Sequence, residues 1–271
     1  SRECFIDDLG KIQKGVSYPA VTDTDVKNQK IPLPPLPEQQ KIAAVLSTVQ
    51  EAKENTEKVI SALKELKKSM MKHLFTYGAV PVAEAERVPL KTTEVGMIPE
   101  DWEVVELGNY CNFTTGKLNS NQAVSDGLYP FFTCSQETYR IDKYSFDCEA
   151  VLLSGNNARG IYSVKHYRGK FDAYQRTYVI TIKDLFALEY KYLRYVLETK
   201  LKSLRDGSIG TSTKFLTLKM LLTLKICLPS LQEQQRISSI LSAINEKLLS
   251  EEQKRSSLDA LFKTLLSLLM T

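Results

Sequence analysis

The stretch "LPPLPEQQKI" at residues 33–42 returns at residues 228–237 as "LPSLQEQQRI". Each copy leads into a long segment that contains neither Pro nor Gly. Proline suits the first turn of a helix but cannot continue one, and a glutamate in that turn meets the positive end of the helix dipole. Both stretches therefore predict the start of a long helix. A helix of about 37 residues would be roughly 55 Å long.

The two stretches belong to an internal repeat with an offset of 195 residues. Residues 31–76 align without a gap to residues 226–271, and 18 of the 46 pairs are identical. The match extends backwards through Gly15 and Gly210, and through Thr22 and Thr217. We infer that residues 77–271 form one complete unit and that residues 1–76 are the tail of another.

Apolar residues in both tails follow the spacing of a coiled coil. In the second copy Ile237, Leu241, Ile244 and Leu248 are separated by 4, 3 and 4 residues. That spacing places them on one side of a helix, where they need an apolar partner. We therefore expect two spacer helices, within residues 31–76 and 226–271, to pair with each other as an antiparallel two-helix coiled-coil stalk.

The segment between the predicted helices has a different composition. Residues 77–97 contain prolines and small residues and predict a linker. Residues 98–225 alternate β-branched and aromatic runs with Gly, Asn, Asp and Ser, which is typical of strands and turns, and one helix is expected near residues 188–204. The predicted fold class is α+β, with a mixed α/β domain at 98–225. Residues 1–30 would be the tail of a first, truncated domain of the same kind.

Composition narrows the classes of function. The chain lacks a run of about eighteen apolar residues, so we expect no membrane span. Its five cysteines are odd in number and show no Cys-x-x-Cys spacing, which favours reduced thiols in a cytoplasmic protein without a metal site. Only two histidines are present, which leaves little scope for catalysis by histidine.

Positive charge is concentrated in one block. Between Arg159 and Lys225, fourteen Lys and Arg residues face five Asp and Glu residues, giving +9. Such a block attracts polyanions, although solvated lysines on an ordinary surface explain it equally simply. Within it, "YSVKHYRGKFDAYQRTYVI" (162–180) interleaves cations with tyrosines. These cations can neutralise phosphates, or they can be solvated residues of a β-meander whose aromatic side chains form the core.

Two loop-like stretches add groups that suit nucleic acid. "GNNARG" (155–160) offers amides and a guanidinium to base edges or phosphates, unless it is merely a polar connection. "DGSIGTSTKF" (206–215) offers hydroxyl groups and a lysine. The residues predicted to contact DNA are Thr115, Lys117, Asn156, Asn157, Arg159, Lys165, Arg168, Lys170, Tyr174, Gln175, Arg176, Thr211, Ser212, Thr213 and Lys214.

Three enzymatic or binding motifs are weak. "GNNARG" lacks the Lys-Ser/Thr of a nucleotide-binding P-loop. Asp172 with Glu189 and Lys191 imitates a nuclease signature, but Glu-x-Lys also occurs at residues 51–53 and 65–67. The Pro-x-x-Pro pattern of residues 32–37 is lost in the second copy. A stand-alone nuclease or modification enzyme, a protein-only coiled-coil scaffold and a non-functional truncation product remain as alternatives.

Taken together, these motifs resemble those of a type I restriction–modification specificity (S) subunit. The resemblance rests on Leu-Pro-x-Leu-x-Glu-Gln-Gln entering a long helix twice, on "IPEDWEVVELGNYCNFTTGK" (98–117) and on "GSIGTSTKFLTLKML" (207–221). It implies that residues 98–225 are a target-recognition domain for double-stranded DNA. It also implies that the helices space such domains and help to dock methyltransferase (M) subunits.

The resemblance further implies a chain without catalytic activity of its own. S-adenosylmethionine would be bound by the M subunits, and ATP and Mg²⁺ by the restriction (R) subunits that join the complex. The family pattern has two recognition domains, whereas this sequence holds one complete one. We therefore expect it to read one half of a bipartite target. From the offset of 195 residues we also expect that two copies can form a homodimer through their helices.

Overall fold

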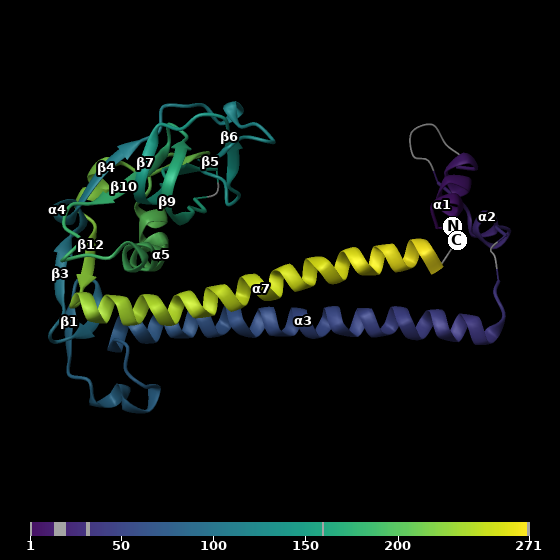
Figure 1. Cartoon of the computed structure of the whole chain (residues 1–271), viewed down its shortest axis with the longest axis horizontal. Coiled ribbons are helices and arrows are strands. Elements are labelled where there is room, and N and C mark those ends of the chain that lie inside the picture. The colour runs from purple at the N-terminus through teal and green to yellow at the C-terminus, as the bar shows by residue number, and fades with distance from the viewer. Residues whose placement is uncertain (1, 14–19, 31–32, 159, 270–271) are drawn as a thin grey trace. The chain divides into compact units, whose positions relative to one another are not determined.

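The computed structural model describes residues 2–13, 20–30, 33–158 and 160–269 (Figure 1). The chain divides into two compact units. Unit 1 comprises Ser1–Leu66 and Ile244–Thr271, and unit 2 comprises Lys67–Ala243. The two long helices, α3 (Leu36–Tyr77) and α7 (Leu231–Leu269), contribute to both units. These helices lie within the ranges predicted for them, apart from the last residue of α3.

Unit 1 contains the antiparallel helix pair. Three ion pairs join α3 to α7, and the residue number falls along α7 as it rises along α3. The pairs are Lys53–Asp259 at 2.7 Å, Glu57–Arg255 at 3.4 Å and Lys64–Glu252 at 3.3 Å. Val49 and Ile60 are buried in this unit. The antiparallel pairing expected from the apolar spacing is confirmed.

Two short helices precede α3 in unit 1: α1 (Arg2–Lys11) and α2 (Asp23–Lys27). Helix α2 is the repeat of α6 (Leu218–Leu222) in unit 2 at the offset of 195 residues. The hydroxyl groups of Thr22 and Thr217 cap these helices in the same way, by accepting from a backbone N–H three residues on. The repeat therefore extends from sequence to local structure.

Unit 2 is built on a six-stranded sheet with the order β4-β10-β7-β9-β5-β6. Its strands are β4 (Cys111–Thr115), β5 (Tyr129–Phe132), β6 (Tyr139–Ile141), β7 (Phe146–Ser154), β9 (Val164–Ala173) and β10 (Thr177–Ile182). Neighbouring strands are antiparallel except β5 and β9, which are parallel. The central strands carry the β-branched and aromatic residues that suit a pleated, buried surface.

Helix α5 (Tyr190–Gly207) supplies much of the main core of unit 2. Tyr192, Leu193 and Val196 of α5 are fully buried among residues of β7, β10 and α7. A second cluster, with Phe132, Phe171 and Val179, gathers other side chains of the sheet. Residues 98–225 hold the sheet and α5, whereas the compact unit 2 extends from Lys67 to Ala243. The helix expected near residues 188–204 is observed at Tyr190–Gly207.

Smaller elements complete unit 2. Strands β3 (Glu103–Glu106) and β12 (Lys225–Leu228) pair antiparallel, as do β8 (Asn156–Asn157) and β11 (Lys214–Phe215). The short helices are α4 (Leu107–Tyr110) and the 3-10 turns η1 (Val82–Arg87) and η2 (Ser120–Gln122). Residues 77–97, expected as a linker, hold η1, β1 (Leu90–Thr93) and the start of β2 (Gly96–Pro99). No described helix is long and apolar enough to cross a membrane.

The second Glu-Gln-Gln stretch fastens the start of α7 to the rest of unit 2. The side chain of Gln234 donates to the carbonyl groups of Ala187 and Pro229, and it accepts from the backbone N–H of Glu189. Glu233 accepts from the N–H of Ala79 at 2.5 Å, close to Gly78, whose φ of +82° suits glycine. The repeated motif is thus a helix start that also binds neighbouring backbone.

Candidate nucleic-acid interface

Several predicted DNA contacts meet where β4 ends and β10 begins. Thr115 is the last residue of β4, and Lys117 follows it in an exposed position. The turn between β9 and β10 holds Tyr174, Gln175 and Arg176, of which the last two are exposed. Gln175 donates from its backbone to Leu118 and from its side chain to Asn119, both at 2.9 Å. The structure therefore brings these two segments together.

Gly116 explains how the two segments approach so closely. A Cβ atom added to Gly116 would lie 1.7 Å from the carbonyl oxygen of Ala173, closer than any real contact. Only glycine leaves room for the turn after β9 to lie against the end of β4. The glycine therefore lets the segment after β4 lie against the turn that holds Gln175.

The remaining loop candidates adjoin this turn. Asn156 and Asn157 form β8, which pairs with Lys214 and Phe215 of β11. The backbone N–H of Gly155 donates to the carbonyl of Arg176 at 2.7 Å, and the Arg176 guanidinium lies 5.9 Å from the Phe215 ring centre. Thr211 and Ser212 are exposed and Thr213 is half-buried. Arg159 lies outside the described residues.

We call this set the loop surface. It comprises Thr115, Lys117, Asn156, Asn157, Tyr174, Gln175, Arg176, Thr211, Ser212, Thr213 and Lys214. Its amide, hydroxyl, ammonium and guanidinium groups are those that pair with base edges and phosphates. The exposed side chains of the loop surface lie in turns that adjoin paired strands, and this strand pairing gives the turns a defined arrangement.

The three candidates on β9 lie in different environments. Lys165 is half-buried, and its ammonium donates to the carbonyl oxygens of Ser135 and Glu137 at 3.2 and 2.6 Å. Burial lowers the pKa of Lys165. The DNA contact predicted for Lys165 stays a prediction. These hydrogen bonds already engage its ammonium within the domain. Arg168 and Lys170 are exposed, and the hydrogen bond with Tyr144 raises the pKa of Lys170.

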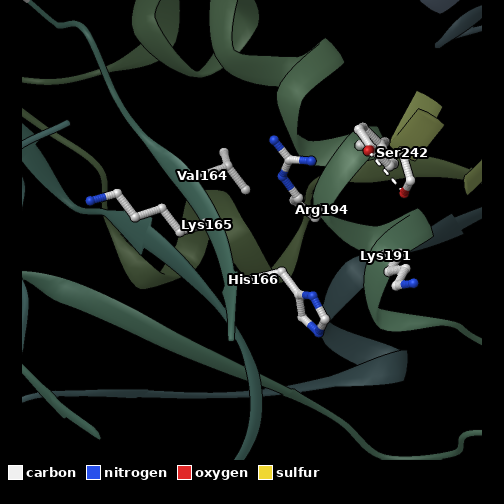
Figure 2. A pocket seen from close by; sticks show the side chains of 7 residues that line it. Val164, Lys165, His166, Lys191, Arg194 and Ser242 are labelled. Atoms are coloured by element: carbon white, nitrogen blue, oxygen red, sulfur yellow. Dashed lines mark hydrogen bonds between the residues drawn. The ribbon is translucent and has the colours of Figure 1, made fainter. Parts of the chain in front are cut away.

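A cleft between β9 and α5 holds basic residues that were absent from the predicted contacts. It has a volume of about 320 Å³ and is lined by residues 164–166 of β9, by Lys191, Arg194 and Tyr195 of α5, and by Ser242 of α7 (Figure 2). Lys191 and Arg194 are three residues apart on one helix, but their proximity to His166 depends on tertiary packing. Sequence patterns carry no signal for such a contact.

The groups of the weak nuclease signature are occupied elsewhere. Asp172 is buried, and its carboxylate accepts from the hydroxyl of Ser145 at 2.6 Å and from the N–H of Ala173. Glu189 accepts from the hydroxyl of Ser238 at 2.6 Å. Within the described residues, no group of three His, Cys, Asp or Glu side chains is placed to hold a metal ion.

The buried cysteines are poor nucleophiles. Burial raises the pKa of the Cys111 thiol to about 12, although Lys183 opposes the shift. Burial also raises the pKa of Cys227, whose sulfur lies 3.6 Å from the Tyr192 hydroxyl. Because the thiolate is the reactive form, both thiols are held in their unreactive protonated state near neutral pH.

A protein-family model described as "Type I restriction modification DNA specificity domain" matches residues 5–65 and 99–260. The EcoDI specificity subunit of a type I restriction enzyme from Escherichia coli is 35% identical over 168 residues, which are 62% of this chain and 36% of that protein. The putative MjaX specificity subunit from Methanocaldococcus jannaschii is 31% identical over 277 residues, 96% of this chain and 62% of that protein. The chain thus spans less than two thirds of either relative.

A solved structure has the same fold. The crystal structure of a type I restriction-modification system S subunit from M. genitalium superposes with a TM-score of 0.71 at 19% identity. The match covers 96% of this chain and 68% of that one. It therefore includes the helix pair as well as the mixed α/β domain.

Proposed function

Because this chain belongs to the type I restriction modification DNA specificity domain family, we propose that its α/β domain binds double-stranded DNA and reads one half of a bipartite target. The loop surface is the observation that carries this proposal. It gathers amides, hydroxyls and cations from four separate segments. Gln and Asn side chains pair bidentately with adenine, and Arg pairs with guanine.

DNA binding is tested with the full chain and a labelled duplex of about 30 mixed base pairs. Each phosphate contact contributes roughly −0.9 to the slope of log affinity against log salt. We expect a steep slope for the unaltered chain. A flat salt dependence would contradict DNA binding and favour a protein-only scaffold.

We further propose that the helix pair docks the M subunits. Val59 and Leu66 of α3 follow Glu57 and Lys64 by two residues, which is about 200° around a helix. Leu261 of α7 has the same relation to Asp259. These apolar side chains are 42–46% exposed, so they lie on the face opposite the ion pairs.

That face also lacks charge along α3. Its residues recur with the alternating three- and four-residue spacing of a helix–helix seam. They are Val45, Thr48, Ala52, Asn55, Val59, Ala62 and Leu66. An uncharged, largely apolar seam that the antiparallel partner leaves exposed suits helices of another subunit.

Val59→Glu is expected to abolish co-purification with the M subunits, because it places a charge in the seam. Ser61→Glu is the matched control, since Ser61 is exposed on the same helix but outside the seam. Equal retention of the M subunits by both variants would contradict docking through this face. Each variant is co-expressed with the M subunits, and the amount of M subunit that co-purifies with it is compared by pull-down.

The chemistry of the complex is proposed to reside in its other subunits. S-adenosylmethionine would be bound by the M subunits, and ATP and Mg²⁺ by the R subunits, in the cytoplasm where cellular DNA is methylated and cut. The engagement of Asp172 and Glu189 in hydrogen bonds within the fold supports a chain that is not itself catalytic.

Two copies of the chain are also proposed to associate through their helices, because α3 and α7 are repeats of one another. Such a homodimer would bring together two recognition domains and read a palindromic split target. Light scattering across a concentration series tests it. If the chain is a monomer at every concentration, and if adding M subunits gives no DNA methylation, the homodimer is contradicted.

A further inference from the structure

The cleft between β9 and α5 has cationic groups that its own carboxylates do not neutralise. Arg194 lies 3.7 Å from Glu198, but Glu198 is bound more closely by Lys67, at 2.5 Å. The Glu198 oxygen nearest Arg194 is Oε2, which is buried and makes no hydrogen bond with any described residue. Because Lys67 and Arg194 share this one carboxylate, one positive charge remains unneutralised beside the cleft.

The Arg194 guanidinium is also held in place. It lies 4.6 Å from the centre of the Tyr195 ring, and Tyr195 is fixed by a 3.2 Å hydrogen bond to Ser242. An ordered, planar guanidinium loses little conformational entropy on binding an oxyanion. Figure 2 shows Arg194 and Lys191 on the α5 side of the cleft, while the Lys165 side chain extends away from them.

Lys191 supplies a second cation. It is exposed in the first turn of α5, and no carboxylate among the described residues forms an ion pair with it. His166 lies across the cleft, where its Nε2 is 2.8 Å from Glu149 and its ring stacks on Tyr190. Two strong cations and a fixed imidazole therefore face a space of about 320 Å³.

The cations continue along β9 beyond the cleft. His166, Arg168 and Lys170 alternate in β9, so their side chains share one face of the sheet at steps of about 6.6 Å. The Arg168 side chain is 82% exposed, and its nearest carboxylate is Glu149 at 4.0 Å. A row of cations fits a polyanion with regularly spaced charges better than it fits a single carboxylate. Each strand of duplex DNA carries one phosphate per about 3.4 Å of helix axis, which gives such a regular row of charges.

The geometry points to the β9–α5 cleft as a binding site for the DNA backbone, in which Lys191 and Arg194 bind one phosphate. Arg168 and Lys170 lie further along β9 and would contact other phosphates of the same DNA strand. This inference rests on the proposed DNA binding. The two surfaces then have different roles: the cleft binds the sugar–phosphate backbone, and the loop surface contacts base edges. Phosphate contacts fix the register of a protein on the duplex and carry no sequence information themselves.

The test measures the affinity of the full chain for a mixed-sequence duplex of about 30 base pairs between about 50 and 200 mM salt. Lys191→Ala/Arg194→Ala removes two phosphate contacts. We expect the salt slope to fall in magnitude by about 1.8, and the affinity near 0.15 M salt to fall roughly thirtyfold. Because the contacts are with phosphates, the loss is the same for every duplex sequence.

Two further variants serve as controls. Lys202→Ala/Lys219→Ala removes the same net charge from exposed positions of α5 and α6, and it is expected to leave the slope nearly unchanged. Lys191→Arg/Arg194→Lys retains both charges and should retain the slope. If the alanine pair fails to fold, Lys191→Ala alone should reduce the slope by about 0.9, because Lys191 is exposed.

The results separate this inference from the proposed function. A flat slope for the unaltered chain contradicts DNA binding itself. A steep slope that Lys191→Ala/Arg194→Ala leaves unchanged, or changes no more than the control pair does, overturns the cleft alone. Loss of M-subunit binding by the alanine pair with an unaltered slope also overturns it, because the cleft would then hold a protein carboxylate.

Discussion

Gln39 and Gln234 are the same residue of the repeat, but they have different surroundings. Both donate from the side-chain amide to the carbonyl of a proline five residues earlier, Pro34 at 2.7 Å and Pro229 at 3.0 Å. Gln234 is fully buried and also binds Ala187 and Glu189, whereas Gln39 is half-buried. The local motif is shared, and the tertiary contacts belong to the second copy.

The difference shows that the repeated stretch has two separable roles. Its local role is to start a helix, which both copies perform. Its second role is to hold that helix against the α/β domain, which Gln234 and Glu233 perform in unit 2. Equivalent substitutions in the two copies should therefore have unequal effects on stability.

The largest difference is expected for the leucine pair. Leu241 is fully buried in the core of unit 2, whereas its equivalent Leu46 is only partly buried. We expect Leu241→Ala to lower the free energy of unfolding by about 3–4 kcal/mol and Leu46→Ala by about 1 kcal/mol. Urea unfolding followed by circular dichroism covers both units, and the fluorescence of the single tryptophan, Trp102, which is buried in unit 2, reports that unit alone. Equal costs would show that the two copies are packed alike.

The glutamine pair compares the two copies through the hydrogen bonds that each glutamine side chain makes. Gln234→Ala leaves the N–H of Glu189 and the carbonyl of Ala187 without their partner, and an unsatisfied buried group costs about 1–3 kcal/mol. We expect a loss of about 2–3 kcal/mol for Gln234→Ala and about 0.5 kcal/mol for Gln39→Ala. Amide hydrogen exchange at residues 187–189 should rise in the Gln234 variant alone. Unaltered exchange there would contradict the fastening role.

The glutamate pair should give the smallest difference. Glu233 accepts from the N–H of Ala79, whereas Glu38 is exposed in the first turn of α3. We expect Glu233→Ala to cost about 1–2 kcal/mol and Glu38→Ala about 0.5 kcal/mol through the helix dipole. Thermal unfolding of the two variants under one buffer condition measures the difference. A larger loss for Glu38→Ala would reverse the assignment of roles.

The periodic parts of the fold were predictable from the sequence. Helices α3 and α7 follow from long segments without Pro or Gly, and their pairing follows from the spacing of apolar residues such as Leu241. The β-branched and aromatic run at residues 177–182 forms β10. Such features depend on neighbours within one turn of helix or within one strand, so local patterns contain them.

The parts that depend on distant residues were not predictable. Residues 77–97 were expected as a linker, yet β1 and β2 pair within residues 90–99. The hydrogen bonds of the Lys165 ammonium to the carbonyls of Ser135 and Glu137 join residues about 30 positions apart, and the local sequence did not predict them. The cleft that holds Lys191 and Arg194 was not predicted, because tertiary packing, and no sequence motif, places these residues opposite His166.

The most direct measurement of the central claim is a map of methylated bases in cells that co-express the chain with its cognate M subunits. We expect methylation at one defined sequence. When Gln175 and Arg176 of the loop surface are replaced by alanine, we expect some positions of that sequence to accept other bases. Methylation that is independent of sequence, or a target that the substitutions leave unaltered, would contradict base reading by the loop surface.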